Sequence, residues 1–299
     1  MFQFLYCLRC AKFESVLIAV VLSHALFVSA IAQQTGVVDA IQKHDQTGPE
    51  IIPLQNAHAH NDYSHERPLL DALKHGFCSV EADIFLVDGE LLVGHNSWSV
   101  KKGRTLEKLY LEPLGRIASS NNGSVHPNGG TFTLLIEFKK DGQKIYPVLK
   151  QQLEKRAKLF SGLRDGKFVQ GAVQVVISGA CPRGLIKQDN QRLVGIDGRL
   201  HDLDSNDPAH LIPLISARWG SHFKWRGHSD LADSERNQLA EIVAKAHASN
   251  RKVRFWATPE SPVVWKQLLD SGVDFLNTDK LAKLRDFLID RQKPEQTKE

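Results

Sequence analysis

The chain lacks the features that mark several specialised classes of protein. It has only four cysteines among 299 residues, and its formal net charge is +4. So few cysteines exclude a small scaffold held together by several disulfides. A weak net charge without a lysine- or arginine-rich stripe gives no indication of nucleic acid as a partner. With so few cysteines, stability must come from a hydrophobic core, and the chain has no internal repeat.

A long apolar run occurs at the N-terminus. Arg9 and Lys12 precede the run VLIAVVLSHALFVSAIA, which ends in the small-residue pattern Ala30-Ile31-Ala32. This pattern predicts a secretory signal peptide over residues 1–32, cleaved near Ala32, and hence an exported protein, periplasmic or secreted. The alternative is a membrane anchor formed by residues 15–32, but this run is short for a spanning helix of about 20 residues.

Cleavage would remove Cys7 and Cys10 and leave two cysteines in the exported protein. Cys78 and Cys181 each lie in or follow an apolar segment, which favours buried free thiols over a disulfide between them. Residues 33–50 are polar and without periodicity, and we interpret them as a linker. Residues 51–290 are then a single domain, and residues 291–299 a disordered tail.

Eight short apolar segments alternate with helical patterns along this domain. Amphipathic helices are predicted around residues 146–160 and 234–250. Strands that are apolar nearly throughout are typical of a parallel sheet covered by helices, and eightfold alternation closes most simply as a (β/α)8 TIM barrel of the α/β class. The predicted strands are residues 51–58, 77–84, 131–139, 172–179, 192–197, 211–216, 252–258 and 273–279.

A small extra hairpin is expected at the C-terminal rim of the barrel. The Asp88-Gly89 turn would join the second strand to residues 90–95. Reactive side chains follow the strand ends nearby, at the rim where barrel enzymes build their active sites. They are His58, His60, Glu81, Asp83, His95, Glu137, Lys139 and Trp256.

Three of these residues are acidic. Glu81 and Asp83 are two apart on a strand, so their carboxylates point to the same side, and Glu137 can join them from the next strand. Converging carboxylates repel one another unless a cation lies among them, and oxygen ligands favour Mg²⁺ or Ca²⁺ over zinc. The alternative is simple pairing with Lys139, Lys140 or Arg104.

Five histidines occur between residues 55 and 96. His58 and His95 bracket the acidic pair and should lie on adjacent rim loops, where they can act as base and acid on one phosphorus centre. His60 is either a catalytic partner or a support for His58. His65 and His75 belong to the first helical region and are expected at the surface.

These residues resemble the phospholipase C-like phosphodiesterase superfamily, in particular the glycerophosphodiester phosphodiesterases. The matching elements are His58, Gly76 before Glu81 and Asp83, the Asp88-Gly89 turn, His95-Asn96, Glu137 and Lys139 in IEFK, Trp256 in RFWAT, and the closing GVDFLNTDKLAKL. The likeness spans about residues 51–289. The variants HAHNDY, LLVGHN, LYLEPL, VISG and RFWATPE are most similar to the altered-inheritance-of-mitochondria protein six family and its bacterial relatives.

Two departures affect the expected phosphate contacts. His58-Ala59-His60 replaces the family's His-Arg-Gly, and His95-Asn96 replaces its His-Asp. The resemblance implies a phosphoric diester hydrolase that depends on a divalent cation, Mg²⁺ or Ca²⁺, held by Glu81, Asp83 and Glu137. Substrate contacts are expected from Lys139, Asn61, Asn96 and Trp256, with Lys139 partly replacing the missing arginine.

The predicted substrate is a small or lipid phosphodiester of the glycerophosphodiester or phospholipid type, with transient contact to a membrane surface. The leaving alcohol stays open, and hydrolysis is not distinguished from a cyclising lyase reaction. Residues 216–230 are expected to shape the pocket for that alcohol, although Trp219 and Trp225 could equally be packing residues. The sequence gives no indication of oligomeric state.

Two other readings compete with this one. A zinc amidohydrolase barrel would use His58, His60 and Asp279, but its remaining metal positions have no matching lysine or histidine here. A degenerate barrel that only binds a phosphorylated ligand should have lost its acid and base residues. The histidines and all three carboxylates are still present.

Overall fold

The structure is a computed structural model that describes residues 51–127 and 130–293. The described residues belong to the compact unit Ile51–Glu299. The predicted signal peptide, the linker and residues 294–299 lie outside the described residues. No helix within the described ranges is long and apolar enough to span a membrane.

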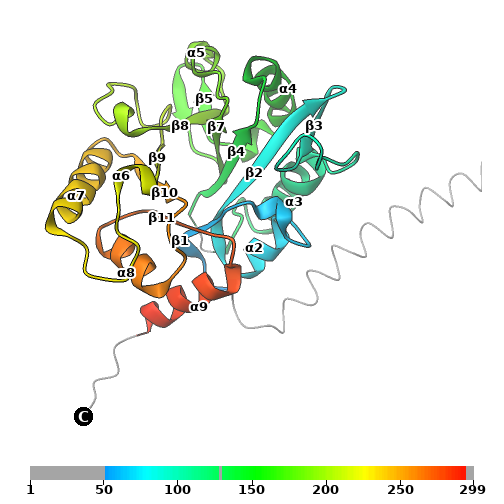
Figure 1. Cartoon of the computed structure of the whole chain (residues 1–299). Coiled ribbons are helices and arrows are strands. Elements are labelled where there is room, and N and C mark those ends of the chain that lie inside the picture. The colour runs from blue at the N-terminus through cyan, green and yellow to red at the C-terminus, as the bar shows by residue number, and fades with distance from the viewer. Residues whose placement is uncertain (1–50, 128–129, 294–299) are drawn as a thin grey trace, which may run out of the picture. The chain divides into compact units, whose positions relative to one another are not determined.

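Eight parallel strands close into a barrel, which confirms the predicted fold (Figure 1). Their spatial order is β1, β11, β10, β9, β8, β7, β4 and β2, and β1 also pairs with β2 to close the ring. Each predicted apolar segment overlaps one of these strands, and four of the strands extend beyond the predicted end. They are β1 Leu54–Ala59, β2 Phe77–Val87, β4 Phe132–Phe138, β7 Val173–Gly179, β8 Val194–Gly198, β9 Leu214–Arg218, β10 Lys252–Trp256 and β11 Phe275–Thr278.

Helices cover the outside of most of the barrel. The predicted helical patterns fall in α4 and α7, but after β8 the chain forms only the short 3-10 turn η4. The helices are η1 Asp62–Ser64, α2 Leu70–Lys74, η2 Glu107–Leu111, α3 Glu112–Ser120, α4 Gly142–Glu154, η3 Ala157–Leu159, α5 Arg183–Gln188, η4 Leu200–Asp202, α6 Trp219–His222, α7 Asp233–Ala248, α8 Pro262–Asp270 and α9 Leu281–Gln292.

Antiparallel strands add to the barrel at two places. The predicted hairpin is confirmed: β3 Glu90–Val93 pairs with β2, and Asp88 and Gly89 have φ of 48° and 82°. These positive angles are the backbone geometry that a two-residue hairpin turn requires. A second hairpin, β5 Gly162–Arg164 with β6 Lys167–Val169, was not predicted.

Alternation along the strands separates an outer core from the barrel interior. Outward side chains such as Leu134, Ile136 and Phe138 of β4 belong to the large buried core under the helices. The side chains between them point inward. A small separate cluster, Leu135, Val176, Leu214 and Phe275, fills the interior below the polar residues of the C-terminal mouth.

Gly76 illustrates how tightly the first helix joins the second strand. It has φ of 80°, and a Cβ atom there would lie 2.2 Å from the carbonyl oxygen of Ile52. Any side chain would therefore clash with the backbone entering β1. The glycine that precedes Glu81 in the motif thus fixes the start of the strand that carries two of the acidic residues.

Two smaller predictions are settled by the described residues. Cys78 and Cys181 are free thiols, although Cys181 is only partly buried. The tail begins later than expected, because α9 continues to Gln292 and the Arg291 guanidinium pairs with Asp270. The predicted boundary at residue 291 was therefore wrong by at least two residues.

Candidate active site

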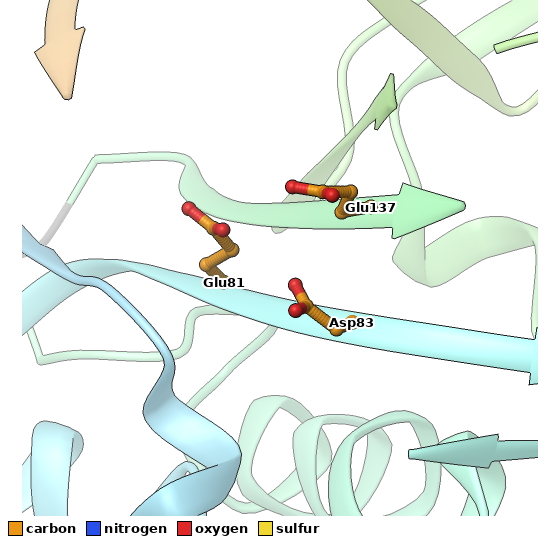
Figure 2. Close-up of side chains that lie close together, drawn as sticks. All are labelled: Glu81, Asp83 and Glu137. Atoms are coloured by element: carbon orange, nitrogen blue, oxygen red, sulfur yellow. The ribbon is translucent and has the colours of Figure 1, made fainter. Parts of the chain in front are cut away.

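Three carboxylates converge inside the barrel mouth. Glu81 and Asp83 rise from β2 and Glu137 from the adjacent β4, with their carboxylate groups projecting toward one another (Figure 2). One oxygen from each lies within 4.8 Å of the others. Glu81 and Asp83 are buried, and the side chain of Glu137 is 30% exposed. The sequence prediction that these three residues meet is confirmed.

Lys139 lies between two of the acids. Its Nζ donates to Glu137 Oε1 at 2.9 Å and to Asp83 Oδ2 at 3.2 Å. Burial would lower the pKa of Lys139, but the hydrogen bond to Glu137 and the charge of Asp83 raise it. The pKa of Asp83 is raised by burial and by the charges of Glu81 and Glu137. One ammonium therefore compensates the cluster only in part.

Arg254 of β10 reaches across the barrel interior to Glu81. Its Nη1 donates to Glu81 Oε2 at 2.7 Å and to His58 Nε2 at 2.9 Å. Burial would raise the pKa of Glu81, but the charge of Arg254 and the adjacent His58 hold it well below its usual range. Glu81 is therefore a buried carboxylate with its own buried counter-ion.

His58 lies deeper than predicted. It belongs to strand β1 and is 1% exposed, whereas a place on a rim loop was expected. Both ring nitrogens are engaged, because Nδ1 lies 2.7 Å from Ser79 Oγ and Nε2 faces Arg254 and Glu81. Burial and the nearby Arg254 lower its pKa to about 4, although the bond to Glu81 opposes the shift. The rim placement was wrong because a period of two fixes the face of a strand but not the depth.

His95 and His60 lie at the mouth instead. His95 Nδ1 is 3.2 Å from Asp83 Oδ2, and its side chain is 59% exposed. His60 Nδ1 is 2.9 Å from Asp279 Oδ1, and its side chain is 31% exposed. In both residues a carboxylate holds Nδ1, and no bond to Nε2 is formed by the described residues.

Tyr63 links these two histidines. Its hydroxyl lies 2.7 Å from Asp83 Oδ2, 2.6 Å from Asn61 Oδ1 and 3.0 Å from His95 Nδ1. Asn61 in turn lies 2.8 Å from His60 Nδ1 through its Nδ2. Burial and the charge of Asp83 raise the pKa of Tyr63 well above its ordinary value, so it stays a neutral hydroxyl.

Asp62 anchors the loop that carries this network. Its Oδ2 accepts from the Leu69 backbone N–H at 2.6 Å and from the Tyr110 hydroxyl at 2.9 Å. Burial raises its pKa to about 7, although the bond to Leu69 opposes the shift. The left-handed Asn61, with φ of 48°, starts the same turn. Residues 60–63 of the HAHNDY motif thus form one hydrogen-bonded loop after β1, in which Asp62 has a structural role.

The other residues predicted to contact the substrate or shape its pocket form contacts with neighbouring residues in the structure. Trp256 is half-buried, and the Cζ atom of Arg218 lies over its ring, 5.8 Å from the ring centre. Asn96 lies in a turn in which its backbone N–H and carbonyl bond Ser99 Oγ. Trp219 and Trp225 are buried packing residues, and Trp219 Nε1 donates to the carbonyl of Trp225.

The zinc alternative finds no support in the geometry. His60 contacts Asp279, but His58 contacts Glu81 and Arg254. Within residues 51–127 and 130–293, the group of three close metal-binding side chains is Glu81, Asp83 and Glu137. An all-oxygen set is the chemistry of hard cations.

Two residues that contact the acidic cluster, Tyr63 and Arg254, were not identified from the sequence. Tyr63 stands in HAHNDY, and its only signal was that it follows the histidines. Arg254 stands in RFWAT, two residues before Trp256, where the period of a strand places both on one face. An arginine at an inward position of an otherwise apolar strand was the available signal.

Comparisons with known proteins identify a family for this chain. A family model described as an AIM6-like phosphodiesterase domain matches residues 45–197, just over half of the 299 residues. The chain belongs to this family. A model of the glycerophosphoryl diester phosphodiesterase family matches residues 252–282 of the AIM6-like chain. The resemblance found in the sequence is confirmed, and family membership supports phosphodiesterase activity in general, without defining the substrate.

Curated relatives of this AIM6-like chain come from fungi. An "Altered inheritance of mitochondria protein 6 homolog" of Arthroderma benhamiae is 29% identical over 79% of this chain and 84% of the relative. The "Altered inheritance of mitochondria protein 6" of Lachancea thermotolerans is 30% identical over 78% of this chain and 65% of the relative. A glycerophosphodiester phosphodiesterase structure from Parabacteroides distasonis has a TM-score of 0.49 and 13% identity, over 82% of this chain and 100% of that chain.

Proposed function

We propose that this protein is an exported, divalent-cation-dependent phosphodiesterase that acts on glycerophosphodiester or phospholipid-type substrates. The observation that carries the proposal is the convergence of Glu81, Asp83 and Glu137 at a mouth that also holds two partly exposed histidines, His60 and His95. The barrel mouth combines a site for a cation with groups that can move protons. A phosphodiester needs both.

The donor set fits Mg²⁺ or Ca²⁺. Asp83 Oδ1 is buried and has no hydrogen-bond partner among the described residues. Against three carboxylates, Arg254 and Lys139 supply two positive charges. A divalent cation together with one singly charged phosphodiester would bring this group of residues to neutrality. When bound by Glu81, Asp83 and Glu137, the cation would supply Lewis-acid stabilisation of the phosphate.

His60 and His95 are the proposed proton-transfer residues. Asp279 and Asp83 hold their Nδ1 atoms, and each Nε2 forms no bond with the described residues. One imidazole would remove a proton from the attacking hydroxyl or water, and the other would protonate the leaving alkoxide. His58, which has both nitrogens engaged, would position Glu81 and Arg254 instead of transferring a proton.

The cationic side chains have a separate role. Lys139 Nζ and the Arg254 guanidinium would place positive charge beside a bound phosphate, in place of the arginine missing from the first motif. If the substrate carries a hydroxyl next to the phosphate, that group can attack and release a cyclic product. A product assay by ³¹P NMR distinguishes this lyase outcome from hydrolysis.

Histidine variants test the proposed roles. His60→Ala and His95→Ala should each lower kcat by about 10²–10⁴-fold and retain divalent-cation binding. His58→Ala should also weaken cation binding, because it removes a contact of Glu81. The matched control is His75→Ala, outside the site, which should leave turnover intact. Full turnover by His60→Ala and His95→Ala would refute the assignment, and a kcat loss confined to His58→Ala would transfer the role to His58.

Export and membrane contact complete the proposal. Mass spectrometry of the exported protein should find an N-terminus near Gln33, and a membrane-bound chain that retains Met1 would favour the anchor.

Beyond His95, Trp98 is 83% exposed, and Lys101 and Lys102 are exposed in the same loop. This combination is typical of a surface that contacts anionic lipid. Trp98→Ala should reduce sedimentation with phosphatidylserine-containing vesicles, and unchanged sedimentation would exclude this contact.

A further inference from the structure

A pocket of about 340 Å³ opens at the C-terminal ends of β8, β9 and β10. Its lining includes Arg199, His201, Ser216, Arg218 and Trp256, and no acidic residue lines it among those that the structure describes. This volume is at the lower end of small-molecule sites, which is the scale of a polar head group. Residues 216–230 were expected to shape such a pocket, and Ser216, Arg218 and His222 do so.

The pocket is joined to the proposed catalytic site through one side chain. Ser216 lies on the pocket floor, and its Oγ is 3.2 Å from Arg254 Nε. The same guanidinium donates through Nη1 to Glu81 at 2.7 Å. Arg254 thus contacts the pocket through Ser216 and the acidic cluster through Glu81. Because Arg254 contacts both, the pocket is a candidate site for the alcohol of a diester whose phosphate lies at the cluster.

The charges around the pocket are predominantly positive. Arg199 is held in place because its Nη1 donates to Asp197 Oδ2 at 2.8 Å and to the Gly198 carbonyl at 2.9 Å. Asp197 is also 4.0 Å from Arg254 Nη2, so one buried carboxylate serves two arginines. Arg218 is exposed, stacks on Trp256, and forms no ion pair with an acid of the described ranges.

We propose that this pocket binds a second anionic group, such as a phosphomonoester, on the alcohol of the substrate. This inference rests on the proposed phosphodiesterase function. Arg218 is one donor, without an ion-pair partner among the described residues, and Arg199, held by Asp197, is a second donor in the lining. Guanidinium groups match phosphate oxygens in geometry and charge. A quaternary ammonium would be repelled, because Arg218 already covers the Trp256 face on which such a cation would stack.

Kinetics on head groups of different charge test the proposal. The substrates are glycerophosphoinositol 4-phosphate, glycerophosphoinositol and glycerophosphocholine. The full protein should have a higher kcat/KM on the first than on the others. Arg218→Gln should reduce this preference by about tenfold, chiefly through KM, which corresponds to loss of one charge-assisted hydrogen bond. Arg116→Gln, an exposed arginine of α3, is the matched control and should keep the preference.

Charge reversal and a binding measurement separate the possible failures. Arg218→Glu should shift the preference toward glycerophosphocholine, and an unchanged preference in both Arg218 variants would overturn the pocket assignment. Calorimetry with inositol 1,4-bisphosphate and inositol 1-phosphate does not need turnover. If no diester is cleaved but the bisphosphate binds at least tenfold more tightly, and Arg218→Gln removes this difference, the proposed function fails and the pocket stands.

Discussion

Arg254→Met tests how the barrel interior tolerates the buried Glu81. The side chains of both residues are at most 5% exposed, and Nη1 and Oε2 are 2.7 Å apart. Removing the guanidinium leaves a carboxylate buried with little compensation. Breaking a buried ion pair in this way costs about 3–5 kcal/mol of unfolding free energy. We expect a loss of this size in the metal-free protein, measured by urea unfolding in EDTA at neutral pH.

A double-mutant cycle isolates the ion pair from the loss of packing. Glu81→Gln removes the charge that Arg254 compensates, so the double variant should lose about 1–3 kcal/mol less than the sum of the two single variants. Arg116→Met removes one partner of an exposed pair in α3 and should cost at most about 1 kcal/mol. Strict additivity at Arg254 and Glu81, or a loss at Arg254 no larger than the control, would refute the reasoning.

Two further predictions concern the HAHNDY loop. Tyr63→Phe should lower kcat by about tenfold or more, because His95 and Asp83 lose a shared hydrogen-bond partner, and wild-type kcat would contradict this role. Asp62 has a pKa of about 7 in the fold against 3.8 ordinarily, so the folded state holds a proton that the unfolded chain releases. Its stabilising contribution is full below pH 4 and is lost as pH rises to 7, by up to about 4 kcal/mol. Asp62→Asn should flatten the decline in urea titrations between pH 4 and 8, and parallel slopes would contradict it.

Much of the fold was predictable because it depends on local pattern. Segments such as 172–179 are apolar nearly throughout, which is what a strand buried on both faces requires. The Asp88-Gly89 turn specified the hairpin in the same way. By contrast, the missing helix after β8 and the β5–β6 hairpin lie in stretches without a clear period. There, tertiary contacts decide the local structure.

The carboxylate cluster was predictable for a related reason. Glu81 and Asp83 share a face by the period of two, and Glu137 occupies the neighbouring strand. The contact of Arg254 with Glu81 was not predictable, because it crosses the barrel between residues 173 positions apart. The depth of His58 depended on the tilt and stagger of the closed barrel, which the sequence does not reveal.

The most direct test of the central claim is calorimetric titration of Mg²⁺ and Ca²⁺ into the full protein and into Asp83→Asn, with diester turnover measured on the same samples. The substitution preserves shape and removes one ligand charge. We predict that the wild-type protein binds one of these cations and cleaves a glycerophosphodiester only when it is bound, and that Asp83→Asn loses both properties while remaining folded. Equal cation binding by the two proteins, or turnover that persists in EDTA, would contradict the account.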